Sequence, residues 1–174
     1  MEKVYLKQMG LEDKESVLDY IQELVLHGSN TDGIWYESED SFEDMLAQIK
    51  KHGEIKFEGY EQEIPIKYQY LLINESDNRL LGMVSIRPFL TRKLDEGFGG
   101  NIGYSIRPSE RRKGYATEAL KLAVIECKKY NPNAPVMVCC NTYNLGSKKA
   151  ILKNSGRLIE KQSGIIPKEK YLID

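Results

Sequence analysis

The strongest constraint on the fold is a stretch in which an apolar strand leads into a long helix and then into a second strand. Residues 101–108, NIGYSIRP, have the pattern of a buried strand, and residues 111–130, RRKGYATEALKLAVIECKKY, follow with helical periodicity. The positions expected to face inward on this helix are Ala116, Leu120, Ala123, Val124 and Cys127. The next segment, APVMVCC at 134–140, has the apolar run of a short strand. A strand, helix and strand in this order form a right-handed crossover, so the stretch predicts a mixed α/β fold.

Further strands and helices surround this unit, and no repeat, low-complexity tract or linker interrupts them. With 174 residues, 41% of them hydrophobic, the chain is expected to form one domain over residues 1–174. Two segments predict helices that pack through one face. Residues 13–28 form the first, which ends at Gly28 and has as its inward residues Val17, Leu18, Ile21, Leu24 and Val25. Residues 41–53 form the second, which begins with a capping box of Ser41 and Asp44 and ends at Gly53. The remaining predictions are a strand at 3–9, a hairpin of 68–74 with 80–88, a helix at 145–156 ended by Gly156, and closing strands at 157–162 and 170–174, the last a candidate edge strand.

Composition excludes several classes of function. The formal charge of −1 favours neither nucleic acid nor an anionic membrane, so we expect neither as a partner. The start MEKVYLKQMGLEDKE lacks the apolar core of a signal peptide, which predicts a cytoplasmic protein. The cysteines, Cys127, Cys139 and Cys140, have no metal-binding spacing and are expected to be reduced. His27 and His52 are the only histidines, so we expect neither a zinc site nor a histidine-based triad.

The start of the helix at 111–130 has the chemistry of an anion site. A helix entered directly from a strand exposes its first amide groups and the positive end of its dipole. Gly114 would let a ligand approach the backbone, and Arg107, Arg111, Arg112 and Lys113 add positive charge. A pyrophosphate would fit there. The alternative is that the basic turn is only a solvated surface and Gly114 an ordinary loop residue.

Other nucleotide-binding motifs are absent from the sequence, which has neither a phosphate loop with Lys-Ser/Thr nor a G-x-G-x-x-G after a strand. Arg111, Gly114 and Ala116 instead resemble the R/Q-x-x-G-x-G/A signature of the GNAT superfamily of N-acetyltransferases. The segment NTYNLGSKKAILKNSG, with Asn144 and Ser147, is similar to the second cofactor motif of that family. The resemblance extends from about Tyr68 to the end of the chain, and it is to a bacterial branch similar to the ribosomal-protein-acetylating type.

The resemblance implies a largely antiparallel central sheet with a splayed parallel strand pair, flanked by helices. It implies acetyl-CoA as cosubstrate, with its pyrophosphate on the backbone amides of Arg111, Arg112, Lys113, Gly114, Tyr115 and Ala116. In the family, the first strand of the splayed pair carries a bulge. In this chain, the main chain of the corresponding strand, near Tyr104 and Ile106, would bind the pantetheine arm. The Ile106 amide would also polarise the thioester carbonyl.

The second motif leaves alternatives open. Asn144 would bind the pantetheine or serve as an ordinary helix N-cap. Lys148 and Lys149 would reach the adenosine phosphates or form a solvated surface.

The chain departs from the family pattern at the position of the proton donor. Many members carry a tyrosine seven residues after the motif asparagine, and here that position is Ile151. Ser147 occupies the position whose side chain, in the ribosomal-protein-acetylating branch, donates a hydrogen bond to the departing sulfur of CoA. Alternatively, the Ser147 hydroxyl only bonds back to its own helix. The branch also tends to have histidines where this chain has Pro88 and Asn101.

The expected reaction is direct attack of a primary amine on the thioester, without a metal. The amine must first lose a proton, and the sequence does not identify the base. Candidate carboxylates are Glu37, Glu39, Asp40, Glu43, Asp44, Glu61, Glu63, Asp95 and Glu96, although each could be a plain surface charge. Two alternative hypotheses for the function remain. The protein could be a catalytically silent acyl-CoA sensor, or an enzyme that acetylates protein N-termini or lysines. A homodimer is also left open. The first two helices are expected to shape the acceptor site.

Overall fold

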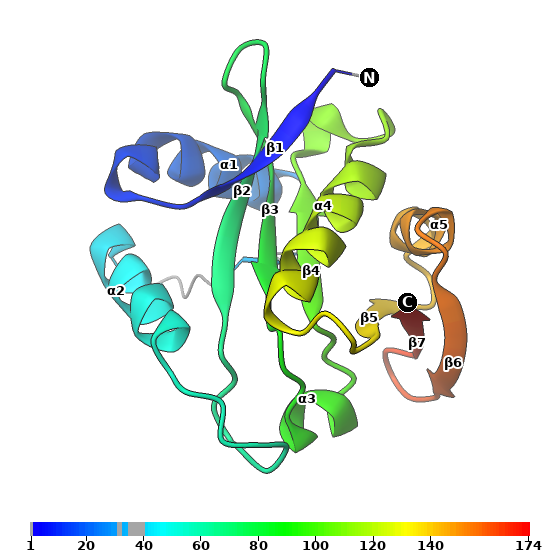
Figure 1. The fold of residues 1–174 in the computed structure, drawn as a ribbon. Coiled ribbons are helices and arrows are strands. Elements are labelled where there is room, and N and C mark those ends of the chain that lie inside the picture. The colour runs from blue at the N-terminus through cyan, green and yellow to red at the C-terminus, as the bar shows by residue number, and fades with distance from the viewer. Residues whose placement is uncertain (1, 31–32, 35–40) are drawn as a thin grey trace.

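The computed structural model describes residues 2–30, 33–34 and 41–174 (Figure 1). Its strands are β1 (Val4–Gln8), β2 (Tyr68–Asn74), β3 (Leu80–Ile86), β4 (Ile102–Ile106), β5 (Val136–Asn141), β6 (Arg157–Gln162) and β7 (Lys168–Ile173). Its α-helices are α1 (Lys14–Leu26), α2 (Phe42–Gly53), α3 (Arg92–Glu96), α4 (Tyr115–Tyr130) and α5 (Leu145–Lys153), and short 3-10 turns cover Leu11–Asp13 and Pro108–Glu110.

Two antiparallel sheets form the framework. The first has the strand order β1-β2-β3-β4, and the second has the order β5-β7-β6. Figure 1 shows α4 across one face of the first sheet, α1 and α2 on its other side, and α5 beside the second sheet. One core joins α4, α5 and both sheets, whereas a separate core joins α1 and α2 to the opposite face of β2 and β3. The mixed α/β class and the largely antiparallel arrangement predicted from the sequence are confirmed.

The strand pairing corrects two predictions. The closing strand was expected at an edge, but β7 lies between β5 and β6. Glu169 and Tyr171 on β7 are buried, whereas every residue of β6 is exposed, so β6 is the edge. The family resemblance implied a bulge in the strand at 101–108. Instead the residues of β4, which ends the first sheet, pair one to one with those of β3.

The helix faces follow the predicted spacing with local differences. In α1 the buried residues are Val17, Tyr20, Ile21 and Leu24, whereas Leu18 and Val25 are exposed, contrary to the prediction. A helix with a 3.6-residue period buries one stripe, and Tyr20 rather than Leu18 lies on it. In α4 Tyr115 and Ala119 join the buried face, and Ala116 and Val124 are only partly buried.

Hydrogen bonds and close packing explain the residues found at the start of α2 and after the end of α5. The Ser41 hydroxyl oxygen accepts a hydrogen bond from the Asp44 amide (3.1 Å) and caps α2 as predicted. Asp44 does not complete the box in the usual way, because its carboxylate accepts from the Ser41 hydroxyl (2.6 Å). After α5, Ser155 takes the left-handed conformation (φ 63°), and Gly156 donates its amide to the Ile151 carbonyl (2.9 Å). A Cβ on Gly156 would lie 2.3 Å from the Ile151 side chain, so close packing requires this glycine.

Candidate active site

The candidate site is the gap between β4 and β5, where the two sheets part. The strands meet at their starts, where the Asn101 amide donates to the Met137 carbonyl (2.7 Å). Within residues 2–30, 33–34 and 41–174, no ladder pairs β4 with β5 beyond this point. The facing edges of β4 and β5 are therefore joined at the Asn101 end and are not paired with each other beyond it. We call this unpaired interval the wedge.

The edge of β4 offers main-chain groups to the wedge. In an antiparallel ladder alternate residues bond the partner strand, and here Arg107 donates its amide to the Leu81 carbonyl (2.8 Å). By the register of β3 with β4, Ser105 and Gly103 also face β3, so the amides and carbonyls of Tyr104 and Ile106 face the wedge. An extended ligand could pair with these groups as an added strand would.

The start of α4 lies at the far end of β4. Gly114 is its N-cap residue and has the left-handed conformation (φ 95°), which glycine adopts without steric cost. No side chain caps this helix, so its first amides remain available to a ligand. Arg112 also has a positive φ (67°), which makes the turn from Arg111 to Gly114 a compact backbone feature. The geometry fits an anion held by main-chain amides.

The cations around this turn are less free than the sequence suggested. Arg107 is buried and points to α1, where its guanidinium pairs with Asp19 (2.8 Å) and Glu23 (2.7 Å). It adds nothing to the anion site, which corrects our expectation. Lys113 pairs with Glu110 (2.8 Å), and Glu110 also accepts from Arg79 (2.7 Å).

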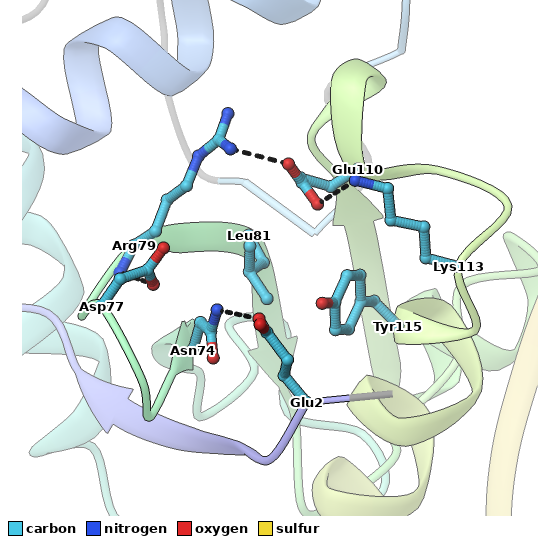
Figure 2. Close-up of a pocket in the computed structure, with 8 residues that line it drawn as sticks. All are labelled: Glu2, Asn74, Asp77, Arg79, Leu81, Glu110, Lys113 and Tyr115. Carbon is cyan, nitrogen blue, oxygen red and sulfur yellow. Dashed lines mark hydrogen bonds and ion pairs between the residues drawn. The ribbon is translucent and has the colours of Figure 1, made fainter.

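Figure 2 shows this Arg79–Glu110–Lys113 bridge at a cavity of about 710 Å³ beside the start of α4. The cavity is lined by Glu2 before β1, by the β2–β3 hairpin and by the segment that leads into α4, and charges of both signs surround it. Arg111 folds back so that its Nε donates to the Ile106 carbonyl (3.1 Å), and Arg112 is exposed. Arg111 therefore also occupies one of the edge carbonyls of β4.

The start of α5 brings Ser147 to Tyr104. The Asn144 side chain accepts from the Ser147 amide (3.0 Å), which is the N-cap arrangement. The Ser147 hydroxyl is not used in that cap and lies 2.8 Å from the Tyr104 hydroxyl. A pair of hydroxyls from β4 and α5 thus bridges the wedge. Ile151, at the position of the family's tyrosine, is fully buried and is part of the core.

A buried carboxylate that pairs with Lys148 on α5 was not predicted from the sequence. Glu169 on β7 is 1% exposed and accepts from the Tyr171 hydroxyl (2.5 Å) and the Lys148 ammonium (2.9 Å). These two contacts, led by Tyr171, lower the pKa of Glu169, so it stays ionised. Lys148 is therefore paired with Glu169 although its side chain is 34% exposed, while Lys149 is exposed. Only the β5–β7 pairing, which sets Glu169 opposite Cys140, could have indicated this cluster.

A family model described as an acetyltransferase (GNAT) domain matches residues 3–156. The chain belongs to the GNAT acetyltransferase family. It is thus an enzyme of the acetyltransferase class, and members of this family use acetyl-CoA. The resemblance inferred from Arg111, Gly114, Ala116 and the second motif is confirmed at the level of the family.

Solved structures share this fold. A ribosomal-protein-serine acetyltransferase structure from Vibrio cholerae is 18% identical (TM-score 0.64) over 99% of this chain and 92% of its own. The ribosomal-protein-S5-alanine acetyltransferase from Vibrio fischeri is 13% identical (TM-score 0.68) over 100% and 95%. A ribosomal L7/L12 alpha-N-protein acetyltransferase, solved with coenzyme A, is also 13% identical (TM-score 0.68) over 97% and 92%. Among curated proteins, none matches the sequence.

Several of the candidate bases of this acetyltransferase are already paired. Asp95 accepts from Lys170 (2.9 Å) and from Tyr60 (2.9 Å), and these bonds, led by Lys170, lower its pKa. Glu43 pairs with Lys14 (2.8 Å) on the surface, and Glu61 pairs with Arg92. Glu63 and Glu96 are exposed, and Asp44 bonds Ser41. Glu37, Glu39 and Asp40 lie outside the described residues. The base is therefore not identified.

Among residues 2–30, 33–34 and 41–174, no three His, Cys, Asp or Glu side chains are grouped so as to bind a metal ion. None of the helices in the described part of the chain combines the length and the apolar character that a bilayer crossing requires.

Replacing the cysteines should cost stability and leave acetyl transfer intact. All three are free, and burial raises the pKa of Cys127 and of Cys139 to about 11 and also raises that of Cys140. Thiols with such pKa values stay protonated at neutral pH and are poor nucleophiles. We expect Cys127→Ala, Cys139→Ala and Cys140→Ala each to lower the free energy of unfolding by about 1 kcal/mol. Loss of turnover in a variant that still folds and binds acetyl-CoA would contradict this expectation.

Proposed function

We propose that this protein transfers the acetyl group of acetyl-CoA to a primary amine, and that residues 1–174 form one catalytic domain. The observation that carries the proposal is the wedge, in which the main-chain groups of Tyr104 and Ile106 face away from β3, on the strand that leads to the uncapped start of α4. The pyrophosphate would bind the amides of residues 111–116, and the pantetheine arm would lie along β4. Family membership supports the same cosubstrate.

The reaction forms one bond, breaks another and transfers a proton. The amine nitrogen attacks the thioester carbon, the carbon–sulfur bond breaks, and the sulfur leaves as a thiolate that takes up a proton. The Ile106 amide, which faces the wedge, suits the developing negative charge on the carbonyl oxygen. The paired hydroxyls of Ser147 and Tyr104 suit the departing sulfur, because either can donate a hydrogen bond.

Ser147→Ala should lower kcat by roughly tenfold to a few hundredfold and leave the affinity for acetyl-CoA nearly unchanged. The Ser147 hydroxyl is not spent on the helix cap, because the Asn144 side chain bonds the Ser147 amide instead. Ile151 cannot donate a proton, so another group must bond the sulfur. Steady-state kinetics on the variant, with calorimetric binding of acetyl-CoA, measure both quantities.

Tyr104→Phe is the companion variant, since it removes the partner hydroxyl without removing the ring. If Tyr104 acts only through Ser147, the double variant should be no slower than Ser147→Ala alone. Full kcat in Ser147→Ala, with only a small drop in melting temperature, would mean that this serine has a structural role.

The acceptor is proposed by class only. The similar structures named above are described as acting on ribosomal proteins, which supports a protein amine over a small metabolite. A screen that follows CoA release should compare peptides with N-terminal serine or alanine, lysine peptides and small amines. Release with one class of acceptor supports an enzyme of that specificity. Tight binding of acetyl-CoA without release from any class would favour the sensor reading.

The cellular location and the oligomeric state are also proposals. Free cysteines are typical of reducing compartments, which supports a cytoplasmic location. A homodimer is testable by light scattering at assay concentrations.

A further inference from the structure

A buried carboxylate, Glu110, lies immediately before the turn at residues 111–114, which we call the anion turn. Its side chain is 9% exposed and joins two cations, because Oε1 accepts from the Arg79 guanidinium (2.7 Å) and Oε2 accepts from the Lys113 ammonium (2.8 Å). Figure 2 shows this bridge beside the cavity at the start of α4. Arg79 comes from the β2–β3 hairpin, so Glu110 ties the anion turn to the first sheet.

The place of this carboxylate is unexpected beside a site for a phosphate group. A negative charge close to a phosphate repels it, and the repulsion is stronger where the protein excludes water. Glu110 also binds the two cations that could otherwise attract the ligand. The arrangement is explained if Glu110 acts on the shape of the anion turn and not through its charge.

The backbone of the anion turn needs to be held in place. Arg112 has a φ of 67° and Gly114 has a φ of 95°. Glycine adopts this left-handed conformation freely, whereas arginine adopts it at a cost and keeps it only where its surroundings impose it. Among the described residues, the main-chain amides from Arg112 to Ala116 donate to no main-chain carbonyl. Main-chain hydrogen bonds of these amides therefore do not impose the conformation.

The side chains on either side of Arg112 supply the restraint. The Lys113 ammonium is bound to Glu110, three residues earlier, so this ion pair closes a loop around Arg111 and Arg112. Arg111 folds back, and its Nε donates to the Ile106 carbonyl (3.1 Å). The left-handed residue thus lies between two anchored neighbours, and of these two anchors the Glu110 pair is the one that spans it.

We propose that Glu110 is a positioning residue that holds the anion turn in its binding conformation before acetyl-CoA arrives. The proposal rests on the proposed function, in which the pyrophosphate lies on the amides of this turn. A ligand that meets a preformed turn does not have to order it, and the affinity falls by the fraction of molecules that lack the competent conformation. Glu110 itself does not bind the phosphate, because both of its carboxylate oxygens are bonded to cations.

The test is calorimetric titration with acetyl-CoA, for which the proposal and a pure charge effect predict different results. Glu110→Gln keeps the size of the side chain but removes its negative charge, so charge alone would make acetyl-CoA bind more tightly. The proposal predicts that the affinity falls by about tenfold, which corresponds to a competent turn in about one molecule in ten. Glu110→Asp keeps the charge but is one methylene group too short to bond both Arg79 and Lys113. Its affinity should also fall, whereas charge alone would leave it unchanged.

Asp77→Asn is the matched control for charge. Asp77 lines the same cavity, and its carboxylate accepts from the Arg79 amide (3.0 Å) and not from the anion turn. This variant also removes one negative charge near the start of α4, and it should bind acetyl-CoA at least as tightly as the wild type. Urea denaturation of all three variants measures stability separately. If Glu110 had only a structural role, its variants would unfold more easily while the folded protein bound acetyl-CoA normally.

The outcomes distinguish this proposal from the proposed function. Weaker binding in both Glu110 variants, with normal or tighter binding in Asp77→Asn, supports the role of Glu110. A fall in neither or in only one of the Glu110 variants overturns it, while the proposed function stands if the wild type binds acetyl-CoA. If Glu110→Gln does not fold, Glu110→Asp decides alone. If the wild type does not bind acetyl-CoA, the proposed function itself fails, and the role of Glu110 falls with it.

Discussion

Gly114→Asp should weaken acetyl-CoA binding on the order of a hundredfold to a thousandfold. The substitution puts a carboxylate at the start of α4, where the proposed site holds a pyrophosphate on main-chain amides. Two unit charges about 4 Å apart repel by about 4 kcal/mol at the effective dielectric of a protein surface. Because about 1.4 kcal/mol corresponds to a tenfold change in affinity, that repulsion gives the expected range. Calorimetric titration with acetyl-CoA measures it directly.

Two matched variants isolate the electrostatic part of this effect. Gly114→Ala adds a Cβ at the same left-handed φ of 95° but adds no charge, so it reports backbone strain and bulk alone. Gly59→Asp makes the same chemical change at another left-handed glycine (φ 126°), where no atom lies within 4 Å of the new Cβ. It should keep normal binding. An unchanged affinity in folded Gly114→Asp would remove the pyrophosphate from this turn.

Arg107→Met should lower the free energy of unfolding by about 3 kcal/mol, the lower end for breaking a buried ion pair from one side. The Arg107 side chain is 7% exposed, and its Nε also donates to the Leu80 carbonyl (2.9 Å). Methionine fills similar space but leaves the Glu23 carboxylate without its cation and the Leu80 carbonyl without this donor. Urea denaturation at pH 7 measures the loss.

The control for Arg107→Met is an ion pair on the surface. Arg92 and Glu61 are 55% and 67% exposed, and pairs of this kind contribute about 0–1 kcal/mol. Arg92→Met should therefore change stability little. The Arg107 guanidinium also lies over the Tyr20 ring, 5.5 Å from its centroid. An equally small effect of Arg107→Met would show that apolar packing against Tyr20, which methionine keeps, and not the ion pair carries the stability at this site.

The Glu23 pKa adds a dependence on pH to this prediction. Burial alone would raise that pKa, but hydrogen bonds from Ser109 and Arg107 outweigh burial and lower it below its ordinary value of 4.5. A carboxyl whose folded-state pKa is lowered contributes stability above its unfolded pKa, and this contribution is lost as the pH falls through the folded pKa. The stability difference between wild type and Arg107→Met should therefore shrink as the pH is lowered from 4.5. A difference that stays constant across this range would contradict the assignment of Glu23.

The order of strand, helix and strand from β4 to β5, the hairpin of β2 and β3, and the family could all be predicted from the sequence. These features are local, because a strand or a helix shows its period within a few turns of chain. The requirement for glycine before α4 is local for the same reason, since the left-handed backbone at Gly114 belongs to that one turn. The roles proposed for Tyr104, Ile106 and Ser147 came from the same motifs, and binding experiments on this chain remain their test.

The tertiary structure alone decided which distant groups meet. Arg107 was predicted as part of the anion site, yet it is buried against α1, because Asp19 and Glu23 lie 88 and 84 residues away in sequence but next to it in space. The Tyr104–Ser147 contact, the Glu169 cluster and the Asn101–Met137 bonds are also set by which strands lie side by side. No period or motif records such pairing, since the bonds depend on side-chain positions that exist only after the sheets have formed.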